Sequence, residues 1–280
     1  MNYKNIEWKK YKGVLLPVVP PHQTIYLSKE EQKDLLKLSN AHLIRWISEW
    51  DIPAETNYWY IIKDSFNGSN EYSSGTRNKV RKGLKYCIVK QISCDYLIQN
   101  GYKVYANAYI NYQKKDKAIN KIPSKKTFID TYSKVREKGE FWGVFDKGQN
   151  TFIAFAENVI RDGAVIYGPM KFDPAYMKSY PSYALIHTMN EYYLDKLSLR
   201  YVSDGPRSIL HESNVQEMLM RVFKFRKAYC RLNLAFSSLA KLSLFYLYPF
   251  RKIIYGINQR PFKELKAVLM MMEILKKDAE

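Results

Sequence analysis

Two apolar runs joined by a two-residue turn constrain the fold of this chain more than any other feature. In TFIAFAENVIRDGAVIYGPMKF, residues 151–172, Asp162-Gly163 separates the runs, and this dipeptide favours the positive φ angles of a tight hairpin. Both runs are apolar on both faces, so they predict central strands covered on both sides. Gly168-Pro169 interrupts the second run, and because proline cannot donate a ladder hydrogen bond, this strand must lose a neighbour there. We therefore expect the sheet to split open near residues 167–170, where an extended ligand could pair with the freed backbone.

A helix start follows the second run. In MKSYPSYALIHTMNEYYLDK, Pro181 suits a first helical turn, and Ile186, Met189 and Tyr193 mark one helical face. Free N–H groups and the helix dipole make such a start a site for phosphate. We therefore expect the cofactor or donor to contact Tyr167, Met170, Lys178, Ser179, Ser182 and Tyr183.

Polar residues then follow the end of another strand. LRYVSDG predicts a strand that ends at Asp204-Gly205, and PRSILHESN predicts a polar loop. Because open sheets place ligands at strand ends, Asp204 and His211 are candidate catalytic residues. Turn formation and local pairing remain open as structural roles for this loop. The candidate substrate-binding residues are Arg207, Ser208 and Asn214.

Glu157 is the third candidate catalytic residue. It lies in the middle of the first apolar run, on the expected face of Phe155 and Val159, where burial would raise its pKa towards that of a useful general base. A carboxylate paired with a nearby lysine is the alternative. His187, within the expected helix, is interpreted as a core histidine.

The charge balance implies an acidic partner. The 280 residues carry 45 Lys and Arg against 27 Asp and Glu, a net charge of +18, which favours nucleic acid, anionic lipid, an acidic carrier protein or phosphorylated small molecules. Residues 218–263 contain ten basic residues and no acidic one, and GTRNKVRKGLKYC is a second basic run. Ordinary solvated helix faces are the alternative explanation.

Several classes of site are disfavoured. The three cysteines have no metal-ligand spacing and the N-terminus shows no signal peptide, so we expect no metal and a reducing cytoplasmic compartment. The sequence also lacks G-x-S-x-G, G-x-G-x-x-G and P-loop motifs, which excludes the simplest hydrolase, dinucleotide and kinase hypotheses.

Three parts are expected along the chain. Residues 1–85 form an N-terminal α/β segment, in which the Ser28/Glu31 capping box begins a helix that should reach about Trp50. Residues 86–236 follow the order β-α-α-β-β-β-α-β-α-β, with Gly101 as the expected division of the first helical stretch. Ser213 with Gln216 forms a second capping box there. Residues 237–280 are a basic helical extension. The fold class is thus mixed α/β with a split central sheet.

This element order resembles the GNAT superfamily of N-acyltransferases over residues 86–236. YPSYALIHTMNEYYLDKLSLRYVSDG looks like its cofactor helix and fifth strand, and NVQEMLMRVFKFRKAY looks like its next helix and strand start. The basic helix TRNKVRKGLK comes directly before this region. With it, the whole chain is most similar to the Fem-type and related GNAT-like transferases of bacterial envelope and polysaccharide pathways. The resemblance implies acyl or aminoacyl transfer to an amine. Glu157, Asp204 and His211 are our candidates for the catalytic residues of such a reaction.

Two departures concern the donor. MKSYPSY has no glycine where the superfamily has a glycine-rich pyrophosphate loop, and Lys224 replaces the usual glycine before Phe225. Acyl-CoA is the donor that the superfamily implies, whereas Fem-type proteins take aminoacyl-tRNA; acyl carrier protein is a further alternative. A catalytically idle GNAT-like module that binds anionic lipid, RNA or acyl carrier protein is the alternative function.

The C-terminal extension suggests a membrane surface. Its last helix should carry Phe262, Leu265, Leu269, Met272 and Leu275 on one face with lysines around it, a pattern compatible with an anionic membrane surface at the inner face of a membrane. The longest uncharged apolar run is far shorter than the ~20 residues of a spanning helix. Packing of this helix on its own domain or on a second subunit is the alternative.

Overall fold

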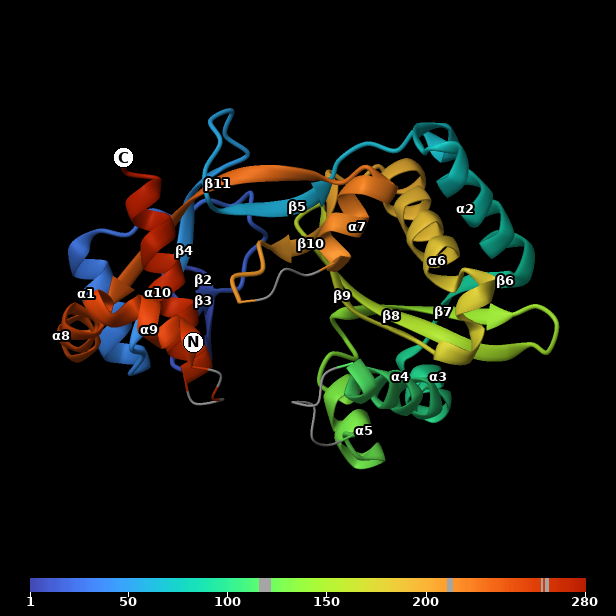
Figure 1. The fold of residues 1–280 in the computed structure, drawn as a ribbon, viewed down its shortest axis with the longest axis horizontal. Helices are drawn as coiled ribbons and strands as arrows, with labels where there is room; N and C mark the ends of the chain where they lie inside the picture. Colours follow the sequence, from blue (N-terminus) through green and yellow to red (C-terminus); the bar gives the residue numbers. More distant parts are fainter. Residues whose placement is uncertain (116–121, 211–213, 258, 260–261) are drawn as a thin grey trace. The chain divides into compact units, whose positions relative to one another are not determined.

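The computed structural model describes residues 1–115, 122–210, 214–257, 259 and 262–280 (Figure 1). The chain forms two compact units, each built from separate segments. The first unit comprises Met1–Ile61, Pro206–Asn214 and Lys227–Glu280, and the second unit comprises Ile62–Gly205 and Val215–Arg226. The division at residues 85 and 236 that the sequence suggested remains a proposal.

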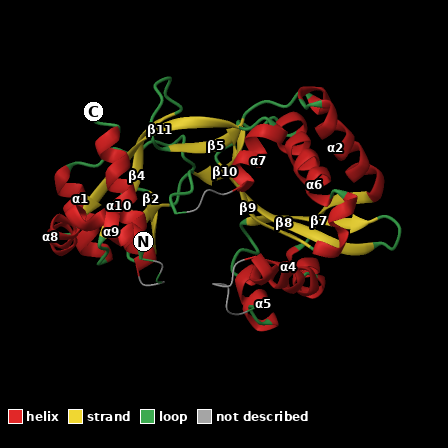
Figure 2. Ribbon diagram, in the orientation of Figure 1, coloured by secondary structure: helices red, strands yellow, loops and turns green. Residues whose placement is uncertain are grey.

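The first unit packs helices on a mixed sheet in the order β1-β2-β3-β4-β11 (Figure 2). The β3–β4 pair is parallel, and the other pairs are antiparallel. The strands are β1 (Asn2–Tyr3), β2 (Ile6–Tyr11), β3 (Val14–Pro17), β4 (Leu43–Trp50) and β11 (Arg226–Phe236). The helices are α1 (Lys29–Ser39), α8 (Ser238–Leu247), α9 (Arg251–Gly256) and α10 (Phe262–Lys277). Strand β5 (Trp59–Lys63) begins in the first unit and ends in the second.

The expected capping box at the start of α1 is confirmed, but the predicted helix is too long. Ser28 accepts from the Glu31 backbone N–H, and the Glu31 carboxylate accepts from the Ser28 backbone N–H. Asn40 adopts a left-handed conformation with φ 47° and ends the helix. Residues from Leu43 to Trp50 then form strand β4 instead of helix, because their apolar residues are buried between β3 and β11.

The last helix packs within its own unit. Leu269, Met271 and Ile274 of α10 are buried, and Phe262, Leu265 and Met272 pack against the same core clusters. The apolar face that suggested a membrane surface is therefore occupied by the protein's own core.

The second unit has a sheet in the order β10-β9-β8-β7-β6 with helices on both faces. In Figure 1, α2 and α6 lie on one face of the β6–β9 sheet, and α3, α4 and α5 lie on the other. The elements are α2 (Ser74–Tyr86), β6 (Cys87–Ile92), α3 (Cys94–Asn100), α4 (Tyr102–Lys115), α5 (Lys125–Ser133), β7 (Gly139–Asp146), β8 (Thr151–Arg161), β9 (Ala164–Phe172), α6 (Pro181–Asn190), β10 (Tyr201–Pro206) and α7 (Asn214–Phe223).

The predicted hairpin forms the centre of this sheet. Asp162 and Gly163 have φ of 44° and 71°, as a two-residue turn with positive φ at both centres requires. Gly101 divides the helical stretch before α4, and a Cβ there would lie 2.6 Å from the carbonyl oxygen of Leu97. The sequence therefore located the turn and the break correctly.

Candidate functional site

A β-bulge in the second unit marks the candidate site. On β8, Asn158 pairs with Tyr167 and Ala156 pairs with Met170, so the single residue Glu157 faces both Gly168 and Pro169. A Cβ on Gly168 would lie 2.6 Å from the Glu157 carbonyl oxygen. Only glycine allows the two strands to approach so closely, and bulges of this kind occur next to active sites.

The predicted split in the sheet lies at the same point. Strand β10 pairs with β9 in parallel from Tyr201↔Ala164 to Ser203↔Ile166, whereas β8 stays paired with β9 as far as Phe172. Beyond Ile166, the edge of β9 therefore has no β10 pairing among the residues that the structure describes. The expectation that the sheet opens near Tyr167 is confirmed.

Tyr167 and Asp204 lie together on one side of the split. The buried hydroxyl of Tyr167 donates to Asn190 Oδ1 of α6 at 2.8 Å. Burial raises the pKa of Tyr167, and the nearby Asp204 carboxylate raises it further. Burial also raises the pKa of Asp204 to about 6, against a hydrogen bond from Gln216 of α7 that lowers it. Asp204 thus has the environment of a carboxyl group that can exchange protons near neutral pH.

A buried polar cluster continues under the bulge. Tyr193 accepts from Trp142 Nε1 at 2.7 Å and from Asn158 Nδ2 at 3.1 Å, and it donates to Glu140 Oε2 at 2.7 Å. The Oδ1 atom of Asn158 is buried without a hydrogen-bond partner in the described part of the chain. Because an unpaired buried polar atom costs stability, native proteins keep few of them and often at functional sites.

Glu157 projects from the opposite face of β8. It is half-buried, and burial raises its pKa. After burial, the Glu157 charge is the largest factor that raises the pKa of Tyr132 in α5, and it also raises the pKa of Cys94 in α3. Glu157 therefore lies on the α3–α5 face, whereas Tyr167 and its partner Asn190 lie on the α6 face. The structure does not bring Glu157 and Asp204 into contact among the described residues.

Lys171 is a site residue that the sequence reasoning missed. It follows the bulge on β9, and its ammonium lies 4.9 Å from the ring centroids of both Tyr109 and Tyr112 of α4. Burial lowers its pKa. Its pairing with Phe155 places it on the same face as Glu157. The two tyrosines, three residues apart in a predicted helix, were the signal that could have indicated an aromatic site for this cation.

The expected helix start forms at Pro181, but most of its first backbone N–H groups are already hydrogen-bonded within the protein. Tyr180 is left-handed with φ 54°, and its carbonyl oxygen accepts from the N–H groups of Tyr183 and Ala184. Pro181 has no N–H. Within this first turn, as far as the structure describes it, only the N–H of Ser182 has no hydrogen bond. A Cβ on Gly83 of α2 would lie 2.8 Å from the Tyr180 carbonyl oxygen. Gly83 of α2 thus lies against the glycine-free segment at the start of α6.

The remaining expected donor contacts lie at different exposures. Lys178 is exposed, Ser179 is half-buried, and the Ser179 carbonyl accepts from the Cys87 thiol at 3.6 Å. Tyr183 has the Lys79 ammonium 5.4 Å from its ring centroid. Met170 is half-buried beside the bulge. A donor role for each of these residues stays a prediction.

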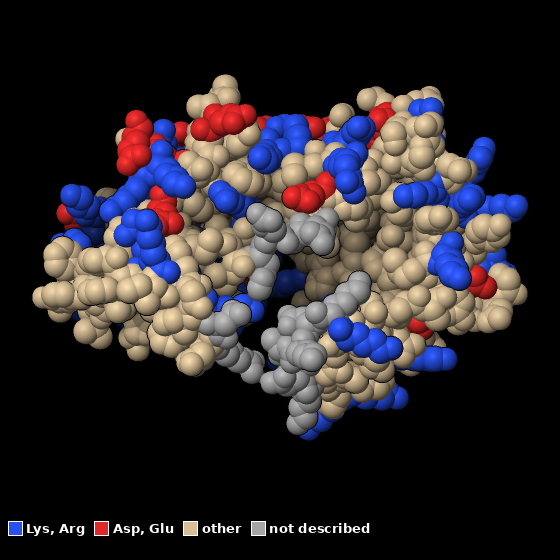
Figure 3. Space-filling view, viewed as in Figure 1, with Lys and Arg blue, Asp and Glu red and all other residues tan. Residues whose placement is uncertain are grey.

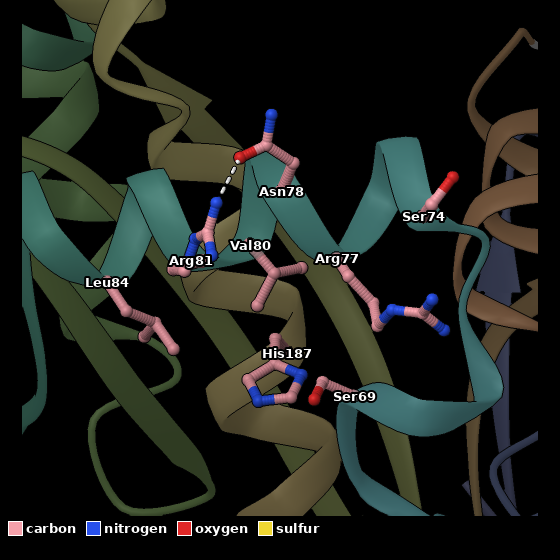
Figure 4. A pocket seen from close by; sticks show the side chains of 8 residues that line it. All are labelled: Ser69, Ser74, Arg77, Asn78, Val80, Arg81, Leu84 and His187. Atoms are coloured by element: carbon pink, nitrogen blue, oxygen red, sulfur yellow. Dashed lines mark hydrogen bonds between the residues drawn. The ribbon is translucent and has the colours of Figure 1, made fainter.

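A basic cavity lies between α2 and α6. It has a volume of about 490 Å³. Figure 4 shows His187 of α6 beside Ser69, and Arg81 donating a hydrogen bond to Asn78 Oδ1 at 2.9 Å. Burial lowers the pKa of His187, and its Nδ1 lies 3.3 Å from the Tyr72 hydroxyl, which agrees with the interpretation as a core histidine. The cavity is lined by Ser69, Ser74, Arg77, Asn78, Val80, Arg81, Leu84 and His187.

The loop after Asp204 belongs to the first unit. Arg207 donates to the Asn57 carbonyl at 2.6 Å, and its guanidinium lies 4.4 Å from the Trp59 ring centroid. Both contacts are with residues of the N-terminal part of the chain, so they are not local in sequence, and Ser208 is half-buried. A substrate-binding role for Arg207 and Ser208 stays a prediction. His211 and the Ser213 capping box lie outside the described residues, as does the side chain of Asn214, so their roles stay predictions.

The structure adds two observations on other classes of site. Among the described residues, no group of three or more His, Cys, Asp or Glu could hold a metal ion. The helices in the same part of the chain are all too short or too polar to cross a bilayer.

Comparison with solved structures identifies the fold. No family model and no curated protein sequence matches the chain. FemX superposes with a TM-score of 0.55 and 12% identity over 85% of this chain and 85% of FemX. L-PGS from Bacillus licheniformis has a TM-score of 0.46 and 10% identity over 86% and 84%. A GCN5-related N-acetyltransferase from Sphaerobacter thermophilus has a TM-score of 0.42 and 9% identity over 82% and 76%.

At these identities, the comparison concerns the fold alone. The FemX superposition covers most of both chains, and the bulged β9 with its diverging neighbour β10 lies in the described sheet. The expected mixed α/β fold with a split sheet is therefore confirmed. The chain has the GNAT-like fold of FemX.

Proposed function

We propose that this protein is an N-acyltransferase that moves an acyl or aminoacyl group from a phosphate-bearing donor to an amine. One observation carries the proposal. Glu157, whose pKa is raised by burial, lies opposite the bulge where β9 and β10 part. A carboxylate with a raised pKa can take a proton from an attacking amine near neutral pH.

The two faces of the split suggest two tasks. The donor would extend along β9 beyond Ile166, where the hydrogen-bonding groups near its acyl or aminoacyl end can pair with the strand edge. The acceptor amine would approach on the α3–α5 face beside Glu157. The new C–N bond then forms as the acyl carbon leaves the oxygen or sulfur of the donor, and Glu157 takes the proton that the amine loses. Asp204 and His211 remain candidates for returning a proton to the leaving group.

Lys171 is a candidate for binding the acceptor or for orienting Glu157. It lies on the same face of the sheet, and its ammonium is held between two aromatic rings. Burial alone shifts the pKa of each group, upward for Glu157 and downward for Lys171. The proposed role of Lys171 therefore rests on its position and not on a charge effect on Glu157.

The donor's phosphate groups have basic residues available on the α6 face. Lys178 lies before the helix start, and α2 carries five basic residues and no acidic one. No salt bridge of the described residues involves these five: Arg77, Lys79, Arg81, Lys82 and Lys85. Because the glycine-free helix start leaves little room for backbone contacts, we favour aminoacyl-tRNA over acyl-CoA, with acyl carrier protein as a third donor.

A donor screen followed by one substitution tests the proposal. Thermal unfolding is measured with acetyl-CoA, longer acyl-CoAs, acyl carrier protein and aminoacyl-tRNA, and a true donor raises Tm. With that donor and an amine, Glu157→Gln should lower turnover by about 10²–10⁴-fold while donor binding is retained. Glu137→Gln, at an exposed carboxylate outside the site, is the matched control. A Glu157→Gln protein with unchanged turnover would remove the proposed base.

A second candidate function rests on the cavity between α2 and α6. Its arginines could bind an acidic ligand without any reaction, as a catalytically idle module would. In that case no donor is turned over, Glu157→Gln changes nothing, and Arg77→Glu with Arg81→Glu abolishes ligand binding. An active transferase instead loses turnover with Glu157→Gln. The same two variants therefore separate the two candidates.

A further inference from the structure

The helices α8 and α9 expose an unusual density of large apolar side chains. Six such residues lie within 15 positions, and each has more than half of its surface accessible. We call them the α8–α9 apolar surface: Leu239 71%, Leu242 56%, Phe245 72%, Tyr246 64%, Phe250 58% and Ile253 69% exposed. Contiguous apolar patches of this kind mark interaction sites on soluble domains.

The opposite side of the same two helices is buried against the first unit. Leu244 of α8 and Ile254 of α9 are buried with Leu269 of α10 in one cluster. Arg251 pairs with Glu273 of α10 at 2.6 Å. The inner side thus fixes α8 and α9 on the first unit, and the apolar surface lies outside this completed core. The described residues of the chain leave it uncovered.

The charged residues within the α8–α9 segment itself are all basic. Residues 238–257 contain Lys241, Arg251 and Lys252 and no acidic residue. Lys241 and Lys252 are exposed, whereas Arg251 already has its carboxylate partner. Figure 3 shows a broad uncharged area over α8 and α9 at the lower left of the view. Apolar side chains bordered by free lysines are complementary to a layer of anionic head groups above hydrocarbon.

We propose that the α8–α9 apolar surface binds the face of an anionic lipid bilayer. Phe245, Phe250 and Ile253 enter the boundary between head groups and acyl chains, and Tyr246 lies at the level of the head groups. Lys241 and Lys252 contact lipid phosphates. Neither helix is long enough to span, so the protein lies on the bilayer. A second copy of the chain is a poorer occupant, because a symmetric pair would place the same lysines of both copies close together.

The sequence suggested a membrane surface on the C-terminal helices and placed the pattern for it on the last one. The structure excludes the apolar face of α10, which lies in the core of the first unit. The α8–α9 apolar surface is a separate feature, and its binding does not depend on the proposed transfer reaction.

Vesicle sedimentation tests the proposal with the full chain. The wild-type protein should bind vesicles of phosphatidylcholine with phosphatidylglycerol, and bind those of phosphatidylcholine alone more weakly. The double variant Phe245→Asp with Ile253→Asp should lower the partition coefficient at least about tenfold, because two charged groups replace the inserted side chains. Lys241→Glu with Lys252→Glu should weaken binding only to the anionic vesicles and reduce its salt dependence.

A matched control and a second measurement keep the result decisive. Leu38→Asp changes a side chain that is 65% exposed on α1 of the same unit, and its vesicle binding should equal that of the wild type. All three variants should keep the wild-type Tm, since the replaced side chains are exposed. Absence of wild-type binding to anionic vesicles would overturn the proposal. A dimer would also overturn it. In that case light scattering shows that the wild type is a dimer and that Phe245→Asp with Ile253→Asp is a monomer, and the wild type does not bind vesicles.

Discussion

The two units of this protein place polar and apolar side chains in opposite ways. All the polar and charged residues found buried in the described structure belong to the second unit: Lys63, Thr76, Asn158, Asp173, His187, Asn190 and Ser203. In the first unit, the buried residues of the described segments are apolar, and the α8–α9 apolar surface is exposed.

Both arrangements oppose the ordinary preference of these side chains. Burying a polar group costs free energy unless it is hydrogen-bonded, and exposing a large apolar group leaves its hydrophobic contribution unused. Three of the buried polar residues lie at the bulge or on α6, namely Asn158, His187 and Asn190, and a low dielectric is the environment that shifts the pKa of acid–base groups. The exposed apolar residues lie together on two helices. The difference corresponds to the two proposals, a transfer reaction in the second unit and attachment to a bilayer surface through the first.

The largest expected effect comes from closing the bulge. Gly168→Ala should lower the free energy of unfolding by about 3 kcal/mol, because its Cβ would lie 2.6 Å from the backbone oxygen of Glu157. Gly75→Ala, in the first turn of α2 with no atom within 4 Å of the added Cβ, is the control and should be neutral or slightly stabilising. Denaturant unfolding measures both. Equal stability of the two variants would show that the bulge does not require glycine.

The next effect tests the buried polar cluster of the second unit. Tyr193→Phe should cost about 2 kcal/mol, since it leaves the Trp142 N–H and the Glu140 carboxylate without the hydroxyl that they contact. The corresponding change in the first unit, Tyr246→Phe, removes an exposed hydroxyl and should change stability by less than about 0.5 kcal/mol. Similar losses from the two variants would contradict the contrast between the units.

The smallest effect concerns Asp204 and depends on pH. Its pKa of about 6 in the folded protein lies above the ordinary 3.8, so the folded state binds more protons between these values, and stability falls as pH rises through that window. Above pH 6, the buried carboxylate is charged in the folded state, which lowers the free energy of unfolding. Asp204→Asn should therefore be more stable than the wild type by about 1–2 kcal/mol near pH 8 and nearly equal near pH 4. Thermal unfolding at both pH values measures the difference, and a constant difference would mean that the carboxyl is not shifted.

The hairpin and the split were predictable because short sequence signals determine them. Asp162-Gly163 adopts its turn through backbone preference alone, and Gly168-Pro169 interrupts pairing wherever the strand lies. The helix over residues 40–50 was predicted wrongly. Leu43, Ile47 and Trp50 fit a helical spacing, and the left-handed Asn40 that ends α1 was not recognised as a cap.

The candidate site was only partly within reach of the sequence. Glu157 and Asp204 were found because an acidic residue in or after an apolar strand is expected to be desolvated. The tyrosine–asparagine contact of Tyr167 with Asn190 and the cation of Lys171 between two rings join residues from different elements. The spacing of Tyr109 and Tyr112 indicates two rings on one helical face, but no spacing along the chain identifies the residue of another element that contacts them.

The sequence by itself determined the local backbone events: the turn at Asp162-Gly163, the capped start of α1, the break at Gly101 and the glycine that the bulge needs. Each depends on the φ preference, the size or the capping hydrogen bonds of a few neighbouring residues. The tertiary structure alone decided which apolar face is buried. It buried the apolar face of α10 and one side of α8 and α9, and left the other side of α8 and α9 exposed. Burial depends on the area that other elements can cover, and amphipathic helices with similar patterns compete for the same core.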